Sequence, residues 1–175
     1  MTHFQRTDTD LHRDAATGNV VYEDRFFIVF RPQPPHCFNS REDGGHLILI
    51  KKVPVHDRSE LSYQEAVDFI RISMAVGKAM YDVLGVERMN YEDLGNWGID
   101  DPGGAKMHLH FLGRSRTQVH QVRGHHIDLF PKGHEIYKGH LEPLTDGEMN
   151  ALREKIIAIL RDEKYVVMAR QAGIE

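Results

Sequence analysis

Residues Lys106–Leu112, with the sequence KMHLHFL, constrain the fold of this chain more than any other segment. Apolar residues recur at every second position, and this period predicts a β-strand, because successive strand side chains point to opposite faces. His108 and His110 then share one face of the strand. The other face is apolar and is predicted to enter a core, through Met107, Leu109 and Phe111.

Two histidines side by side on a rigid strand suit two kinds of chemistry. They can serve as nucleophile and proton donor. They can also serve as two ligands of a zinc ion, with His46 as a third ligand and an open position for water. The rest of the sequence is needed to choose between these two kinds of chemistry.

Composition narrows the class of protein. A chain of 175 residues that is 41% hydrophobic is long enough for one domain with a buried core. The net charge of −4 argues against general nucleic-acid binding, which needs clustered Lys and Arg. No apolar run is long enough to span a membrane, and the polar segment Met1–Asn19 lacks the apolar core of a signal peptide, so we expect a cytoplasmic protein.

Strand patterns dominate the first third of the chain. Val20–Glu23 and Phe26–Phe30 are rich in β-branched and aromatic residues and predict two strands joined by a tight turn. The segment 31–45 contains three prolines and ends in Asp-Gly-Gly, which predicts a loop. The apolar run His46–Ile50 then predicts a buried strand.

Helical spacing appears twice. Ser62 and Glu65 form a capping-box pattern ahead of an apolar stripe that Gly85 ends. A second such pattern begins at Thr145 and predicts a helix over residues 145–163. Between them, Met89–Leu94 is a further strand candidate ahead of the glycine-rich stretch 95–104. Residues 114–144 show no period and predict an irregular excursion.

The predicted architecture is therefore an α+β domain spanning residues 20–175. It has an antiparallel sheet of about five strands with two main α-helices packed on it, preceded by the polar segment 1–19.

Two motifs give the chain a family resemblance. One is Gly45–Lys52 (GHLILIKK) ahead of the first helix, and the other is His108–Arg114 (HLHFLGR) after Asn96 and a glycine-rich turn. In this order they resemble the histidine triad family of nucleotide hydrolases and transferases, over roughly residues 20–114. The resemblance implies a homodimer with a continuous sheet and a purine nucleotide substrate, without a cofactor or a metal.

The resemblance also implies roles for individual residues. His108 matches the histidine that attacks the α-phosphorus of a nucleoside phosphoramidate or dinucleoside polyphosphate. His110 matches the one that donates a hydrogen bond to a phosphoryl oxygen or to the bridging atom. His46 matches the upstream histidine, expected to lie against the nucleophile, and Asn96 matches an asparagine near the phosphates.

The sequence departs from the family pattern at three places. Lys106 stands where the first triad histidine is expected, although its backbone carbonyl can still orient the nucleophile. The turn 102–105 lacks the Gln-Ser or Gln-Thr pair that contacts the α-phosphate. Where the ribose-binding acid is expected, the chain has Phe30-Arg31-Pro32, and Glu42 or Asp43 are the candidate substitutes.

Three interpretations follow from the sequence. The first is a hydrolase in which His46, His108 and His110 are catalytic and in which Phe30, Asn96 and Lys106 contact the nucleotide. The second is a catalytically weak or inactive nucleotide-binding module, because of Lys106 and the altered turn. The third is a metal-dependent hydrolase that uses the same three histidines.

Overall fold

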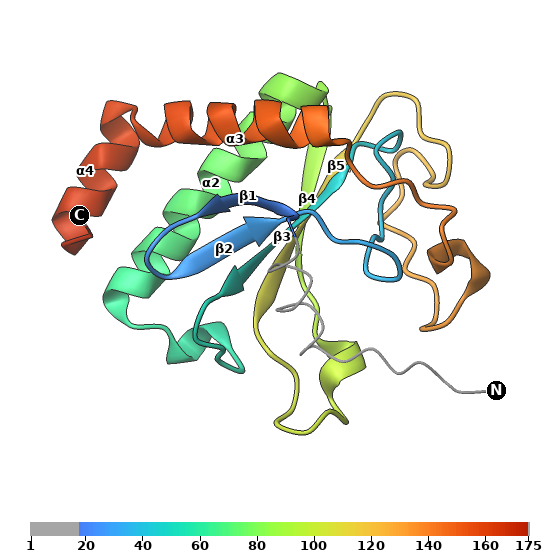
Figure 1. Ribbon diagram of the computed structural model, residues 1–175, viewed down its shortest axis with the longest axis horizontal. Helices are drawn as coiled ribbons and strands as arrows, with labels where there is room; N and C mark the ends of the chain where they lie inside the picture. The colour runs from blue at the N-terminus through green and yellow to red at the C-terminus, as the bar shows by residue number, and fades with distance from the viewer. Residues whose placement is uncertain (1–17, 175) are drawn as a thin grey trace.

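A five-stranded antiparallel sheet forms the centre of the computed structural model, which describes residues 18–174 (Figure 1). Its strands lie in the order β1-β2-β3-β5-β4, so β5 is inserted between β3 and β4. The predicted strands are all present, as β1 (Val20–Glu23), β2 (Phe27–Phe30), β3 (His46–Lys51), β4 (Arg88–Asp93) and β5 (His108–Arg114). Of the predicted segment Met1–Asn19, all but the last two residues lie outside the described part of the chain.

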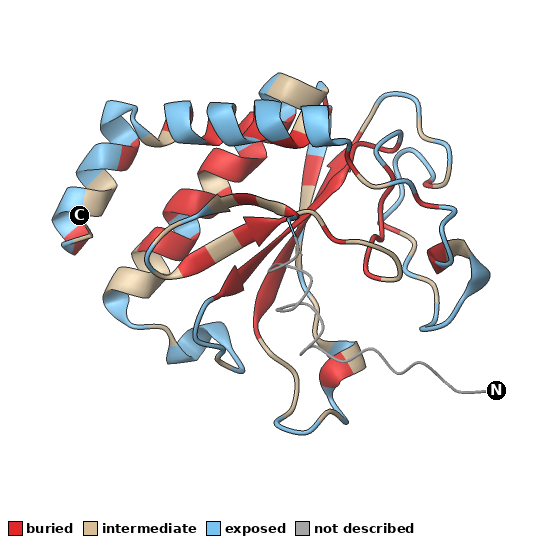
Figure 2. Cartoon of the chain, in the orientation of Figure 1, coloured by how far each residue is buried: buried red, intermediate tan, exposed pale blue. Residues whose placement is uncertain are grey.

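Three helices of the described residues pack together beside the sheet: α2 (Tyr63–Leu84), α3 (Asp146–Leu160) and α4 (Glu163–Ala172). The main core lies between α2, α3 and one face of the sheet, and Figure 2 shows the central strands buried while much of α3 and α4 is exposed. Fully buried members of this core are Leu47, Leu49, Ile72, Met80, Phe111, Leu152 and Ile156. None of the helices within residues 18–174 is long and apolar enough to cross a membrane.

The predicted helix starts are confirmed. Ser62 accepts a hydrogen bond from the backbone N–H of Glu65, and the Glu65 side chain accepts one from the N–H of Ser62. Thr145 and Glu148 cap α3 in the same way. Each capping box satisfies N–H groups that have no partner inside the helix. Gly85 ends α2 with a left-handed backbone (φ 65°), which glycine adopts without strain.

The prediction of a single helix over residues 145–163 is wrong at its carboxyl end, because α3 stops at Leu160 and a separate helix, α4, begins at Glu163. The N–H groups of Arg161 and Asp162 bond to Ala158 and Ile159, which forms a tight turn, and Asp162 then takes an extended backbone that starts α4. The turn contains neither Gly nor Pro, so the sequence carries no strong stop signal there. As a result α4 turns back to pack against α2, with Tyr165 buried.

Residues 115–144 form the predicted irregular excursion, with one short turn of 3-10 helix at Glu135–Tyr137. The excursion contributes Ile127, Tyr137 and Leu141 to a second apolar cluster, which lies against Leu112 of β5. It therefore covers part of the sheet face opposite the helices.

Candidate active site

The two faces of β5 differ, as the alternation of its sequence predicts: one carries the core residues and the other carries the histidines. Met107, Leu109 and Phe111 are buried in the main core under the helices. His108 and His110 point to the other face and are only 5% and 2% exposed. Their rings meet edge to face, with centroids 4.8 Å apart.

His46, the first residue of β3, joins the pair from the neighbouring strand. The register pairs His46 with Leu112 and Ile48 with His110, so His46 and His110 are diagonal neighbours on one face. Their ring atoms His46 Nε2 and His110 Nδ1 are 2.9 Å apart. The hydrogen-bond partner of His46 is thus His110, and not the predicted nucleophile His108.

A backbone hydrogen bond sets the proton positions of His46 and His110. The N–H of Phe38 donates to Nδ1 of His46 over 3.1 Å, so this nitrogen must carry a lone pair. In the neutral ring Nε2 of His46 then carries the proton and donates it to Nδ1 of His110. The proton of His110 is thereby placed on Nε2, a buried atom with no hydrogen-bond partner among the described residues.

His108 carries its proton on the other ring nitrogen, Nδ1. Its Nδ1 lies 2.7 Å from the backbone carbonyl oxygen of Lys106, and only an N–H can donate to that oxygen. The lone pair of His108 is therefore on Nε2. The two neighbouring rings present a nucleophilic nitrogen and a hydrogen-bond donor, which are the complementary groups that phosphoryl transfer uses.

Burial keeps His46 and His110 neutral. Removal from water lowers the pKa of His46 from 6.5 to about 3, and the neighbouring His36 and His108 add to this effect. Burial also lowers the pKa of His110 well below 6.5. The neighbouring His108 lowers it further, by a smaller amount. Neither ring accepts a second proton near neutral pH, so the assigned proton positions persist.

Phe38 is a site residue that the sequence analysis missed. Its ring stacks on His46 with centroids 5.5 Å apart, and it lies 5.2 Å from the ring of His110. Trp97 and Tyr137 pack against its other sides. The only sequence signal was an aromatic residue in the proline-rich loop that precedes His46.

The side chain of Lys106 lies on its own turn. Its Nζ donates to the carbonyl oxygen of Gly103 and is 3.4 Å from Nδ1 of His56. The position thus has two separate parts: a backbone carbonyl that orients His108, and an ammonium group beside the turn 102–105. The first part is independent of the side chain.

Asn96 and Phe30 lie farther from the three histidines. Asn96 is exposed in a 3-10 turn after β4, and within residues 18–174 no hydrogen bond links its side chain to the histidines. Phe30 is fully buried on the histidine face of the sheet, where it packs with Ile48 and Ile50. These three residues form an apolar group beside β5.

The candidate substitutes for a ribose-binding acid have other roles. Asp43 is fully buried, and its Oδ1 accepts hydrogen bonds from the N–H groups of residues 119, 120 and 121, at 2.7, 3.0 and 3.3 Å. Its Oδ2 accepts one from Ser40. Asp43 therefore anchors the excursion and does not face a nucleotide. Arg31 is directed toward Leu144 and Asp146 at the start of α3, and Glu42 is exposed.

The geometry does not favour the metal alternative. His46 and His110 use Nε2 and Nδ1 for each other, and the second nitrogen of His46 accepts from Phe38, so His46 has no lone pair for a metal. In the described part of the chain, no three His, Cys, Asp or Glu side chains are arranged to hold a metal ion together.

Comparison with known proteins identifies the fold. No family model and no curated protein sequence matches this chain. Solved structures do match, among them a histidine triad protein of Sinorhizobium meliloti, with 18% identity and a TM-score of 0.58 over 90% of this chain and 98% of that one. A histidine triad protein of Marinobacter aquaeolei matches with 20% identity and a TM-score of 0.55, over 85% and 92% of the two chains.

A third match is a zinc-bound histidine triad family protein of Mycobacterium smegmatis, with 16% identity and a TM-score of 0.56 over 86% of this chain and 91% of that one. At such identities the likeness concerns the fold. The chain has the α+β fold of histidine triad proteins, with the five-stranded antiparallel sheet that the sequence predicts.

Proposed function

We propose that this protein is a nucleotide hydrolase or nucleotidyl transferase. It acts on the α-phosphate of a nucleoside phosphoramidate or dinucleoside polyphosphate through a nucleotidyl-histidine intermediate. The observation that carries the proposal is the pair of fixed tautomers: His108 with its lone pair on Nε2, and His110 with its proton on Nε2. The histidine triad fold supports it.

The proposed reaction has two steps. Nε2 of His108 forms a bond to the α-phosphorus while the bond from phosphorus to the leaving amine or phosphate breaks, and the leaving group takes a proton from solvent. The N–H of His110 stabilises the charge on the phosphoryl or bridging atom. Water then cleaves the bond between Nε2 and phosphorus, which restores His108 and releases a nucleoside monophosphate.

The other proposed contacts lie around this centre. Lys106 is proposed to attract the phosphates beyond the α-position, because its ammonium lies beside the turn that leads to β5. Asn96 is proposed to contact the phosphates from its exposed turn. The apolar group around Phe30 lies buried on the same sheet face, and the purine base is proposed to bind next to it.

The second candidate is a nucleotide-binding module without turnover. It is favoured by the turn 102–105, which offers no hydroxyl or amide side chain to the α-phosphate. It is also favoured by Arg31, which stands where the resemblance places an acid and binds α3. Such a protein would bind a nucleoside monophosphate and be stabilised by it.

One assay distinguishes these functions. Diadenosine tetraphosphate and adenosine phosphoramidate are each incubated with the protein, with and without a chelator, and the release of AMP is measured. The proposal predicts turnover that survives the chelator and disappears in His108→Ala but not in His140→Ala, an exposed histidine of the excursion. Turnover that needs metal favours the third interpretation. No turnover, together with a raised melting temperature in AMP, favours the binding module.

A homodimer is part of the proposal. Strand β4 is one of the two edges of the sheet in the described residues, with β1 at the other, and an unpaired edge can extend the sheet into a second copy. Tyr91 on β4 is exposed, as are Ile70 and Tyr81 on α2, and Tyr81 accepts a hydrogen bond from the N–H of Met89 in β4. Burying them between two copies would remove them from water.

A further inference from the structure

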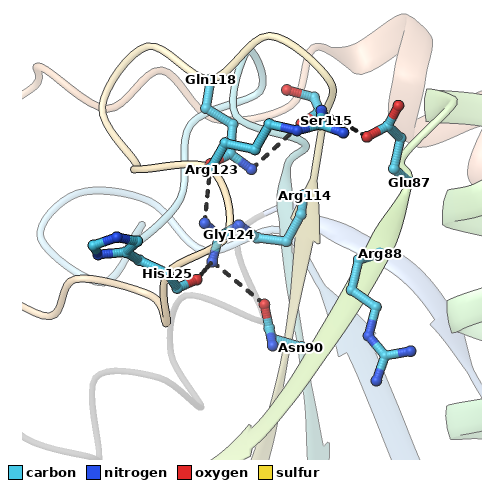
Figure 3. Close-up of a pocket in the computed structure, with 9 residues that line it drawn as sticks. All are labelled: Glu87, Arg88, Asn90, Arg114, Ser115, Gln118, Arg123, Gly124 and His125. Carbon is cyan, nitrogen blue, oxygen red and sulfur yellow. Dashed lines mark hydrogen bonds and ion pairs between the residues drawn. The ribbon is translucent and has the colours of Figure 1, made fainter.

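A cavity of about 390 Å³ lies at the far end of the histidine face, away from the proposed active site. It opens to solvent and is lined by the ends of β4 and β5 and by residues of the excursion between 115 and 125 (Figure 3). Its lining is polar and includes three arginines, Arg88, Arg114 and Arg123, and one acid, Glu87. Cavities of this size hold small organic ligands.

Arg114, at the end of β5, is the central residue of the cavity. It is only 6% exposed. Its guanidinium donates to the carbonyl oxygen of His125 at 3.1 Å and to the side-chain oxygens of Gln118 and Asn90 at 2.9 and 3.5 Å (Figure 3). It also donates to the carbonyl oxygen of Val122 at 2.8 Å, so all four acceptors are neutral. Arg114 forms no ion pair within residues 18–174, and its Nε has no hydrogen-bond partner there. The positive charge is thus buried without an ion-pair partner among the described residues, and burial of an unpaired charge costs free energy.

The other charged groups leave the cavity positive. Arg123 and Glu87 form an ion pair of 2.7 Å and neutralise each other. Arg88 is exposed and has no ion pair in the described part of the chain, and its guanidinium is directed away from Arg123 in Figure 3. Three guanidinium groups and one carboxylate give the lining a net charge of +2, in a chain whose net charge is −4. A local positive charge in an acidic protein attracts small anions.

The cavity is separated from the histidines. His110 and Arg114 are four positions apart in the continuous strand β5, with three residues between them, a span of about 13 Å at the usual rise per residue. Leu112, midway between them on the same face, is fully buried under Tyr137 and Leu141 of the excursion. A ligand in the cavity therefore does not contact the reacting atoms at His108.

We propose that this cavity binds a small molecule that carries a phosphate group. A phosphate dianion matches the charge of +2. The planar guanidinium groups of Arg88 and Arg123 can donate paired hydrogen bonds to phosphate oxygens, and Arg114 has its Nε–H left to donate. The amides of Asn90 and Gln118 add polar contacts to the rest of the ligand. The volume exceeds that of a phosphate ion alone, so the ligand is a phosphorylated molecule. The proposal is independent of the reaction at His108.

Equilibrium dialysis of the full chain against inorganic phosphate tests this site. The test variant is Arg88→Gln/Arg123→Gln, which spares Arg114 because Arg114 also holds the excursion in place. The control is Arg161→Gln/Arg170→Gln, which removes the same charge from two exposed positions outside the cavity. His110→Gln removes the donor of the histidine site. Circular dichroism checks that every variant is folded.

We expect saturable binding at millimolar phosphate, weakened about tenfold or more in the cavity variant. Binding by the control and by His110→Gln should stay within about twofold of the original chain, since they leave the cavity's contacts unchanged. Glu87→Gln should tighten binding, because it removes the only carboxylate of the lining. Loss of binding in His110→Gln, equal weakening in the control, or no saturable binding would each overturn the proposal. None of these results depends on whether the protein hydrolyses nucleotides.

Discussion

Nε2 of His46 lies 2.9 Å from Nδ1 of His110, and this hydrogen bond determines which nitrogen of His110 carries its proton. Because Phe38 donates to the other nitrogen of His46, the chain of donors runs in one direction and ends at Nε2 of His110. The loop before β3 therefore controls a proton on β5. A change at Phe38 or His46 can alter the chemistry without touching a substrate.

The buried pair His46 and His110 predicts a pH-dependent stability. The pKa of His46 falls from 6.5 to about 3 on folding, and that of His110 falls as well, so the unfolded chain binds more protons between these values. The free energy of unfolding should thus be fully retained above about pH 6.5 and decrease as the pH falls toward 3, by up to about 1.4 kcal/mol per pH unit for each histidine.

Urea denaturation between pH 7.5 and roughly pH 4.5 measures this slope. His46→Gln retains one acceptor and one donor but does not titrate, so its slope should be shallower by about half. The exposed His140→Ala variant is the control and should keep the original slope. An unchanged slope in His46→Gln would show that another group causes the acid sensitivity.

Asp43→Ala should destabilise the protein without weakening nucleotide binding. The change leaves three N–H groups of residues 119–121 without their acceptor, which predicts a loss of about 3 kcal/mol in the free energy of unfolding. Glu42→Ala, at the exposed neighbouring position, should change it by less than about 0.5 kcal/mol. If Asp43→Ala were as stable as the original chain but lost AMP binding, Asp43 would be a ligand residue after all.

Much of the fold follows from local sequence patterns, since the alternation in β5 and the capping boxes at Ser62 and Thr145 act over a few residues. The roles of Asp43 and Phe38 could not be predicted, because Asp43 binds an N–H 76 residues away and Phe38 contacts histidines on two strands. The same holds for the cavity around Arg114. Its shape depends on how an aperiodic segment folds back onto the sheet.

Lys106→Met should distinguish the role of the Lys106 backbone carbonyl from the role of its ammonium group. The backbone carbonyl still accepts the hydrogen bond from His108, so kcat should fall by less than about tenfold, while KM for a dinucleoside polyphosphate rises because the ammonium is lost. Lys106→His, which restores a triad histidine, should likewise keep the reaction. Steady-state kinetics measure both variants. A fall in kcat of about a hundredfold or more in Lys106→Met would mean that the ammonium takes part in the chemical step.

Ile70→Glu should prevent the proposed dimer, because it places a charge among the exposed apolar residues of α2, the helix that contacts β4 through Tyr81. Sedimentation velocity would then show a dimer for the original chain and a monomer for the variant. Ile157→Glu, at an exposed apolar position of α3, is the matched control and should leave the dimer intact. A monomeric original chain would contradict the proposal.

The most direct test of the proposed function is mass spectrometry of a reaction quenched during turnover of adenosine phosphoramidate. The covalent mechanism predicts an adenylyl group on His108. It should be attached through Nε2, because the Nδ1–H donates a hydrogen bond to the carbonyl oxygen of Lys106. The adduct should be absent in His108→Ala and present in His140→Ala. Continued turnover with no adduct on His108, or an adduct on a different histidine, would contradict the account.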